Sequence, residues 1–104
     1  MLKRKIIEGK MYDTTTAKAV GSFSNTPYQN DFEYYCETLY RKRTGEFFLY
    51  GEGGPSSPYA EQIRYNEWGY GEDIIPMPED DAKHWAEVHL TADQYVAIFG
   101  PVAE

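Results

Sequence analysis

Residues 34–50, which read YYCETLYRKRTGEFFLY, decide the fold of this chain. Two runs rich in aromatic and β-branched residues flank Arg43-Thr44-Gly45, which suits a β-hairpin whose three-residue loop has Gly45 in the left-handed conformation. This loop length aligns chemically matched pairs across the strands: Lys42 with Glu46, Tyr40 with Phe48, and Leu39 with Leu49. The pattern predicts an antiparallel sheet built around this hairpin.

The C-terminal part of the sequence predicts two helices. Residues 78–81 open the first with a run of acids, which the helix dipole favours in a first turn. Its apolar positions recur at i, i+3 and i+4 spacing, in Ala82, Trp85 and Ala86. A capping box formed by Thr91 and Gln94 starts the second helix, and Gly100 ends it. Side chains from both helices are expected to cover one face of the sheet, namely Trp85, Ile98 and Phe99.

The remaining segments complete the predicted fold. Residues 5–8 read as a short strand, and residues 13–20 as a two-turn helix with Asp13 as its N-cap and Gly21 as its end. Residues 51–71 read as a loop with a turn of helix near residues 59–63. Residues 73–77 form another strand, which Pro76 confines to a sheet edge or to the strand's end. We therefore predict one α+β domain, residues 1–104, with a small antiparallel sheet, a short N-terminal helix and two C-terminal helices.

The composition indicates which cellular compartment suits the protein and which kinds of protein it does not resemble. The chain has 104 residues, the size of one domain, and 16% of them are aromatic, which supplies a core without disulfides or metals. Cys36 is the only cysteine, so no intrachain disulfide can form and a reducing compartment fits best. The N-terminus lacks the apolar region of a signal peptide, and no stretch has the 18 apolar residues of a membrane span. We expect a cytoplasmic protein.

Charge is distributed unevenly along the chain. Residues 1–50 carry eight Lys or Arg against six acids, a net charge of +2, whereas residues 51–104 carry two against eleven, a net charge of −9. The second half would repel a phosphate backbone and attract a basic protein surface. An acidic face that only keeps the domain soluble is the simpler interpretation of the same pattern.

The sequence gives only weak signals for a catalytic or metal site. His84 and His89 are five residues apart, whereas two metal ligands on one helix need a spacing of three or four. Cys36 lies mid-strand, without a histidine motif that would activate its thiol. We therefore expect no metal, no cofactor and no enzymatic activity.

Two charged segments and one aromatic feature remain as candidates for binding. The acidic candidates lie in the second half of the chain: Glu72, Asp73, Glu79, Asp80 and Asp81. The basic candidates lie at the hairpin tip: Arg41, Lys42 and Arg43. The ten tyrosines exceed what a small core needs, so several are expected to be exposed, as in protein contact surfaces.

Several motifs spread along the chain carry a resemblance to a known family. They are Ile6-Ile7-x-Gly9-Lys10-x-Tyr12-Asp13-Thr14, Glu37-Thr38-Leu39-Tyr40, Gly45-x-Phe47-Phe48-Leu49-Tyr50-Gly51-Glu52-Gly53-Gly54-Pro55, Ile74-Ile75-Pro76, and Trp85-Ala86-Glu87 followed by Ala92-Asp93-x-Tyr95-x-x-Ile98-Phe99-Gly100. With them, nearly the whole chain resembles a family of small acidic proteins encoded by plasmids, conjugative elements and phages of Gram-positive bacteria.

This resemblance implies a function in the conflict between mobile elements and their hosts. Small mobile-element proteins of this kind include anti-CRISPR proteins that inhibit Cas9-type nucleases, whose nucleic acid lies in a positively charged channel. The leading hypothesis is a non-enzymatic inhibitor that binds such an effector, or its guide-RNA complex, through the acidic residues. The alternative is a nucleic-acid-associated accessory or regulatory protein of a mobile element that uses Arg41, Lys42 and Arg43.

Overall fold

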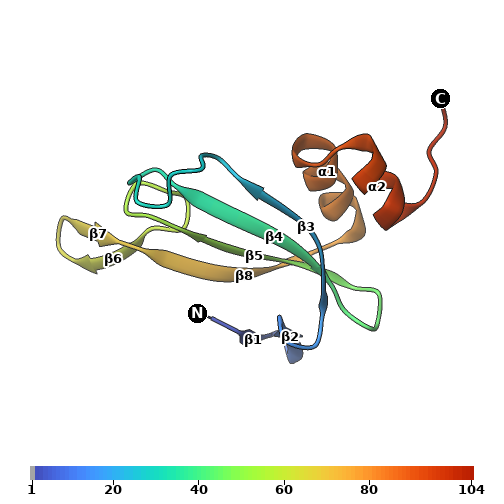
Figure 1. The fold of residues 1–104 in the computed structure, drawn as a ribbon. Helices are drawn as coiled ribbons and strands as arrows, with labels where there is room; N and C mark the ends of the chain where they lie inside the picture. Colours follow the sequence, from blue (N-terminus) through green and yellow to red (C-terminus); the bar gives the residue numbers. More distant parts are fainter. Residues whose placement is uncertain (1) are drawn as a thin grey trace.

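The computed structural model describes residues 2–104, which form an elongated molecule of 49 × 32 × 20 Å (Figure 1). Its main antiparallel sheet has the order β3-β4-β5-β8, formed by β3 (Lys18–Ser24), β4 (Tyr35–Arg41), β5 (Phe47–Gly53) and β8 (Gly71–Met77). Two further hairpins join β1 (Arg4–Ile7) to β2 (Lys10–Asp13) and β6 (Glu61–Arg64) to β7 (Glu67–Gly69). Helices α1 (Glu79–His89) and α2 (Ala92–Phe99) follow, which confirms the α+β class and the two C-terminal helices.

The β4–β5 hairpin has the predicted register. Leu39 lies opposite Leu49 and Tyr40 opposite Phe48, and the Lys42 amide donates to the Glu46 carbonyl at 2.8 Å. Gly45 has φ +92°, a conformation that favours glycine and lets the three-residue loop close. Local pairing therefore determines the centre of the sheet.

The predicted N-terminal helix over residues 13–20 is wrong, because Lys18–Ser24 form strand β3 instead. The Asp13 carboxylate accepts hydrogen bonds from the amide and hydroxyl of Thr15 at 2.8 and 2.6 Å, so it stabilises a turn where a helix cap was expected. The chain then pairs with β4, with Ala19 opposite Tyr40. Gly21, the expected helix end, lies within β3, where an added Cβ would come within 2.7 Å of the Leu90 side chain.

Residues 51–71 are more regular than the predicted loop. Strand β5 continues through Gly53, and β6 and β7 form a hairpin where a turn of helix was expected near residues 59–63. Gly51 leaves room for the side chain of Tyr59, because a Cβ at this position would overlap the Tyr59 ring. The glycines that suggested a loop therefore let a neighbouring segment pack against a strand.

Two clusters of buried side chains lie on opposite faces of the main sheet (Figure 1). On one face, the helices cover a cluster of six residues: Leu39, Phe47, Leu49, Ala82, Trp85 and Ala86. On the other, the β1–β2 hairpin contributes Tyr12 to a cluster with Phe48, Tyr50 and Ile74. The predicted burial of Trp85, Leu39 and Leu49 is confirmed. Strand alternation explains the two clusters, since neighbouring residues of β5 point to opposite faces.

The predicted details of the C-terminal elements are also confirmed. Thr91 accepts from the Gln94 amide at 3.2 Å, and the Thr91 amide donates back to the Gln94 side chain at 3.0 Å. Pro76 lies in β8, an edge strand of the sheet. Among residues 2–104, no helix combines the length and the apolar character that crossing a membrane requires.

Candidate functional site

The three acids at the start of α1 are the exposed members of the predicted acidic group. Glu79, Asp80 and Asp81 form its first turn, and all three are exposed. Within residues 2–104 none of them forms a salt bridge. Their charges are therefore free to act on a partner, and the helix dipole stabilises them there.

Glu72 and Asp73 differ from these acids because each is already held by a neighbour. The Lys5 ammonium lies 2.8 Å from the Asp73 carboxylate, and the Tyr50 hydroxyl lies 2.8 Å from that of Glu72. Residues 73–78 run extended at about 3.3 Å per residue, which separates the two acidic groups by about 20 Å. The five predicted residues therefore form two separate groups along the molecule.

Glu72 belongs to a tyrosine–carboxylate network that the sequence analysis missed. Glu52 and Glu72 lie directly opposite each other on β5 and β8. The Tyr50 hydroxyl oxygen lies 2.7 Å from Glu52 and 2.8 Å from Glu72, and the Tyr70 hydroxyl also donates to Glu52. The i, i+2 spacing of Tyr50 and Glu52 on one strand is the sequence signal that could have revealed this pairing.

A second network lies on the helix-covered face of the sheet and centres on Glu37 of β4. The Trp85 indole N–H donates to the Glu37 carboxylate at 3.0 Å, and the Tyr59 hydroxyl donates to the other carboxylate oxygen. The network joins α1, β4 and the segment that follows β5. Since both oxygens of Glu37 accept bonds from within the chain, this carboxylate stabilises the fold.

These networks predict a loss of stability at alkaline pH. Burial, followed by the adjoining carboxylates, raises the pKa of Tyr50, Tyr59 and Tyr70 well above the ordinary value near 10. Because the pKa is higher in the folded state, the stabilisation is complete below about pH 10 and is lost as the pH rises beyond it. We expect the melting temperature to begin to fall at about pH 10 and to keep falling as the pH rises further.

The control is Tyr50→Phe, which has no phenol proton to lose at that position. This variant is less stable at neutral pH but should show a shallower decrease of melting temperature over the same alkaline range. Identical slopes for Tyr50→Phe and the unmodified protein would contradict the assignment to this network.

The predicted basic site at the hairpin tip is partly occupied by internal contacts. The Lys42 ammonium lies 3.7 Å from the centroid of the Tyr12 ring and 3.7 Å from the Glu46 carboxylate. The Arg41 guanidinium lies 5.6 Å from the centroid of the Phe47 ring. Arg43 is exposed, and Lys18 lies opposite Arg41 in the β3–β4 register. Lys42 therefore packs within the fold, and the accessible cations here are Lys18, Arg41 and Arg43.

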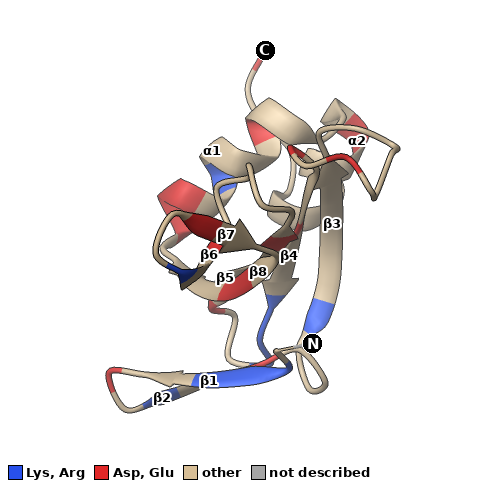
Figure 2. Cartoon of the chain, turned by 90° about the vertical axis from the view of Figure 1, so that its left-hand side faces the viewer, with Lys and Arg blue, Asp and Glu red and all other residues tan. Residues whose placement is uncertain are grey.

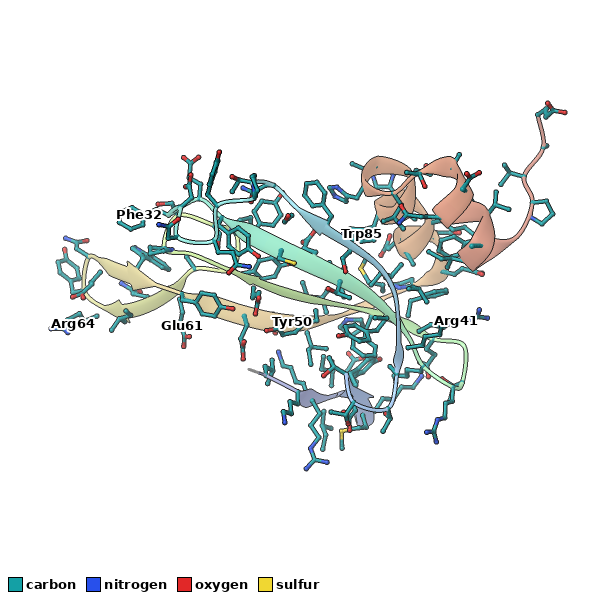
Figure 3. The ribbon with its side chains drawn as sticks, viewed as in Figure 1. Phe32, Arg41, Tyr50, Glu61, Arg64 and Trp85 are labelled. Atoms are coloured by element: carbon teal, nitrogen blue, oxygen red, sulfur yellow. The ribbon has the colours of Figure 1, made fainter. Side chains whose placement is uncertain are left out.

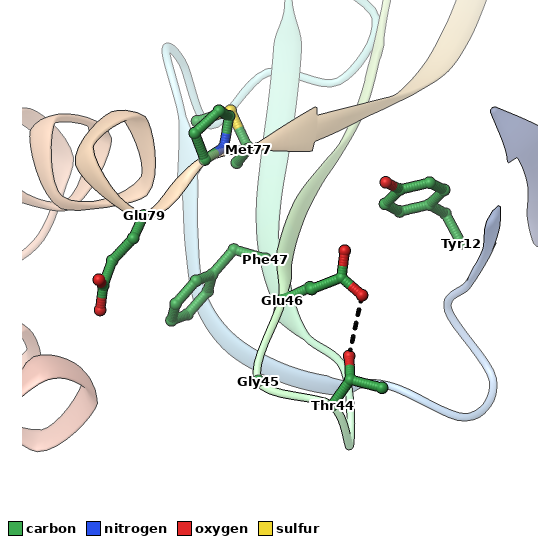
Figure 4. A pocket seen from close by; sticks show the side chains of 8 residues that line it. Tyr12, Thr44, Gly45, Glu46, Phe47, Met77 and Glu79 are labelled. Carbon is green, nitrogen blue, oxygen red and sulfur yellow. Dashed lines mark hydrogen bonds between the residues drawn. The ribbon is translucent and has the colours of Figure 1, made fainter. Parts of the chain in front are cut away.

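A hollow of about 450 Å³ lies beside this hairpin tip, between β2, the β4–β5 loop and the start of α1 (Figure 4). Phe47 and Met77 supply apolar lining, and Glu46 and Glu79 supply carboxylates. Thr44 donates to Glu46 at 3.1 Å, and the Lys10 ammonium lies 3.0 Å from the same carboxylate. Because Glu46 is satisfied within the chain, Glu79 is the acid that the hollow presents to solvent.

His89 and Cys36, two of the remaining candidates, lie among side chains of the fold. The ring of His89 lies between Phe23 and Trp85, with centroid distances of 4.1 and 5.2 Å. Burial raises the pKa of the half-buried Cys36 thiol above its ordinary value. Over residues 2–104, no group of three or more His, Cys, Asp or Glu side chains is arranged to hold a metal ion.

Comparison with known proteins adds no relative. No protein family, curated protein or solved structure matches this chain.

Proposed function

We propose that this chain is a non-enzymatic inhibitor that binds the basic, nucleic-acid-binding surface of a protein partner through its acidic residues. The observation that carries the proposal is the separation of charge in space. Most Lys and Arg lie on or beside β1, β2 and the adjoining ends of β3 and β4, with Arg64 on β6 and Lys83 on α1 as exceptions, whereas Asp and Glu are frequent at the start of α1 and on β7 and β8 (Figure 2). An acidic region of this kind attracts a cationic surface and repels nucleic acid.

The acids at the start of α1 are the first contact in this proposal. Glu79, Asp80 and Asp81 are exposed and have no salt-bridge partner within the described chain, so binding a cation breaks no internal ion pair. The family resemblance makes a Cas9-type nuclease, loaded with its guide RNA, the first partner to test, because such effectors hold nucleic acid in a positively charged channel. An inhibitor that occupies this channel would block target DNA from entering.

The test is the triple variant Glu79→Gln/Asp80→Asn/Asp81→Asn, measured against a guide-loaded Cas9-type nuclease. We expect association at low salt to slow by on the order of tenfold, because long-range attraction is lost. The salt dependence of association should flatten as well. The three side chains are exposed, so circular dichroism should show an unchanged fold. Association by the triple variant as fast as that of the unmodified protein at low salt would exclude the acidic turn as the contact.

A nucleic-acid-associated accessory protein is the alternative function, favoured by the basic region in Figure 2. Its test is Lys18→Ala/Arg41→Ala/Arg43→Ala, which keeps Lys42 because that side chain packs on Tyr12. Under the alternative, this variant loses binding to duplex DNA and the salt slope of binding flattens. Under the proposed function, it binds the nuclease as the unmodified protein does.

A further inference from the structure

The exposed aromatic side chains gather at one end of the molecule. Five aromatic residues are more than half exposed, and three of them are tyrosines, which confirms that several tyrosines are accessible: Tyr28, Phe32, Tyr65, Trp68 and Tyr70. Tyr28 and Phe32 lie in the β3–β4 connection, and the others lie on or beside the β6–β7 hairpin. Both segments lie at the same end of the sheet (Figures 1 and 3). We call these five residues the aromatic end.

The hairpin that carries Tyr65 and Trp68 lies apart from the main sheet. Strands β6 and β7 pair only with each other among the described residues, and the hairpin projects beyond the main sheet (Figure 1). Tyr65 lies in its two-residue turn with 88% of its surface exposed. Scattered apolar residues on a surface are ordinary, but a group of aromatic residues at one end is typical of a binding surface.

The aromatic end is held in a defined position. The Ser56 amide donates to the Phe32 carbonyl at 2.8 Å, which ties the β3–β4 connection to the segment leading into β6. The Tyr70 hydroxyl donates to Glu52 of β5, which anchors the exit of the hairpin. A surface ordered before binding loses less conformational entropy when a partner docks.

Carboxylates lie on the same two segments as these rings. Asp31 and Glu33 flank Phe32, and Glu61 and Glu67 lie on the hairpin. Arg64 is the one basic residue in residues 25–34 and 54–72, and its guanidinium lies 2.9 Å from Glu67. The combination of exposed rings and excess carboxylates favours a partner with cationic side chains.

We propose that the aromatic end binds an arginine- or lysine-rich segment of a protein. A guanidinium or ammonium group lies over the face of an aromatic ring, where the electron-rich π-system attracts it, and its N–H groups donate to the neighbouring carboxylates. An uncharged apolar partner would desolvate the carboxylates of Asp31, Glu33 and Glu61 without offering them a cation. Single-stranded nucleic acid could stack on the rings, but its phosphates would meet Asp31, Glu33, Glu61 and Glu67. This inference rests on the proposed function for the basic character of the partner, and it adds a contact far from α1.

The experiment measures the fluorescence polarisation of a labelled nona-arginine peptide titrated with the full chain. We expect Tyr65→Ala/Trp68→Ala to weaken binding at least tenfold while the melting temperature stays unchanged. The matched control is Ile6→Ala/Met11→Ala, an exposed cross-strand pair on the β1–β2 hairpin, which should bind as the unmodified protein does. Retained binding by Tyr65→Ala/Trp68→Ala would overturn the proposal.

A second variant removes charge and keeps the rings. Glu61→Gln/Glu67→Gln should weaken peptide binding and flatten its salt dependence, because fewer carboxylates meet the cations. If Tyr65→Ala/Trp68→Ala unfolds, this variant decides the question, and unchanged binding by it would overturn the proposal. Tight binding of a labelled single-stranded oligothymidine to the unmodified chain would identify a nucleic-acid surface instead. Self-association that Tyr65→Ala/Trp68→Ala abolishes would identify a second copy as the partner.

The two proposals can fail separately. Peptide binding tests the aromatic end without the nuclease, whereas the Glu79, Asp80 and Asp81 variant tests the acidic turn with it. Should the acidic-turn variant bind the nuclease normally while Tyr65→Ala/Trp68→Ala loses it, the aromatic end is the contact and the acidic turn is not. Should peptide binding depend on neither ring, the aromatic end fails, and the acidic turn is judged on its own variant.

Discussion

Replacing Trp85 with alanine is expected to lower the free energy of unfolding by about 3–5 kcal/mol. Trp85 is 7% exposed and lies in the core cluster between the helices and the sheet, with Leu39 and Leu49. Its removal leaves a cavity that rigid neighbouring strands cannot fill, and it also removes the indole donor to Glu37. Chemical denaturation followed by circular dichroism measures the loss.

The variant Trp85→Phe separates these two contributions. Phenylalanine keeps an aromatic ring in the cluster but has no N–H for Glu37, which then retains only the Tyr59 hydroxyl as a donor. We expect a smaller loss than for alanine, of about 1–3 kcal/mol. Equal unfolding free energies for Trp85→Ala and the unmodified protein would mean that the helices do not pack on the sheet through this residue.

Replacing Phe48 with alanine is expected to cost a similar amount, about 3–5 kcal/mol, on the opposite face of the sheet. Phe48 is fully buried. Its ring stacks on Tyr40 at a centroid distance of 5.2 Å and meets the edge of Tyr12 at 5.7 Å. Because Tyr12 belongs to β2, this contact attaches the β1–β2 hairpin to the sheet.

The result of this change should be visible in the hairpin itself. We expect limited proteolysis to cut Phe48→Ala within residues 4–13 faster than the unmodified protein, since loss of the ring frees the hairpin. The control is Phe48→Leu, which keeps most of the apolar contact and should be cut at an intermediate rate. Equal cleavage rates for Phe48→Ala and the unmodified chain would show that ion pairs such as Lys5–Asp73 hold the hairpin without the ring.

The acidic candidates could be identified from the sequence, whereas the position of the aromatic surface could not. The five acids could be found from the sequence because charge is visible there, but their division into two groups depends on the extended path of β8. Glu72 and Asp73 are less suitable for binding because Tyr50 and Lys5, which are distant in sequence, already contact their carboxylates. The excess of tyrosine indicated an exposed surface without indicating its position.

The sequence alone determined the elements whose stability comes from nearby residues. The β4–β5 hairpin is closed by a three-residue loop, the capping box at Thr91 joins residues three positions apart, and the apolar spacing of α1 is visible within one helix; all three were predicted correctly. Pro76 likewise indicated an edge strand, because proline cannot donate to a ladder.

Only the tertiary structure decided the rest. Residues 18–24 have a weak local preference, and pairing with β4 overrides the helix expected over residues 13–20. Strand β5 continues through Gly53 because β4 and β8 pair with it on both sides, and Gly51 leaves room for the Tyr59 ring. The two-sided core, the carboxylate networks and the aromatic end join residues more than 15 positions apart. Such contacts depend on how the strands are ordered and paired. The alternation of apolar residues along one strand does not show which strands lie beside it.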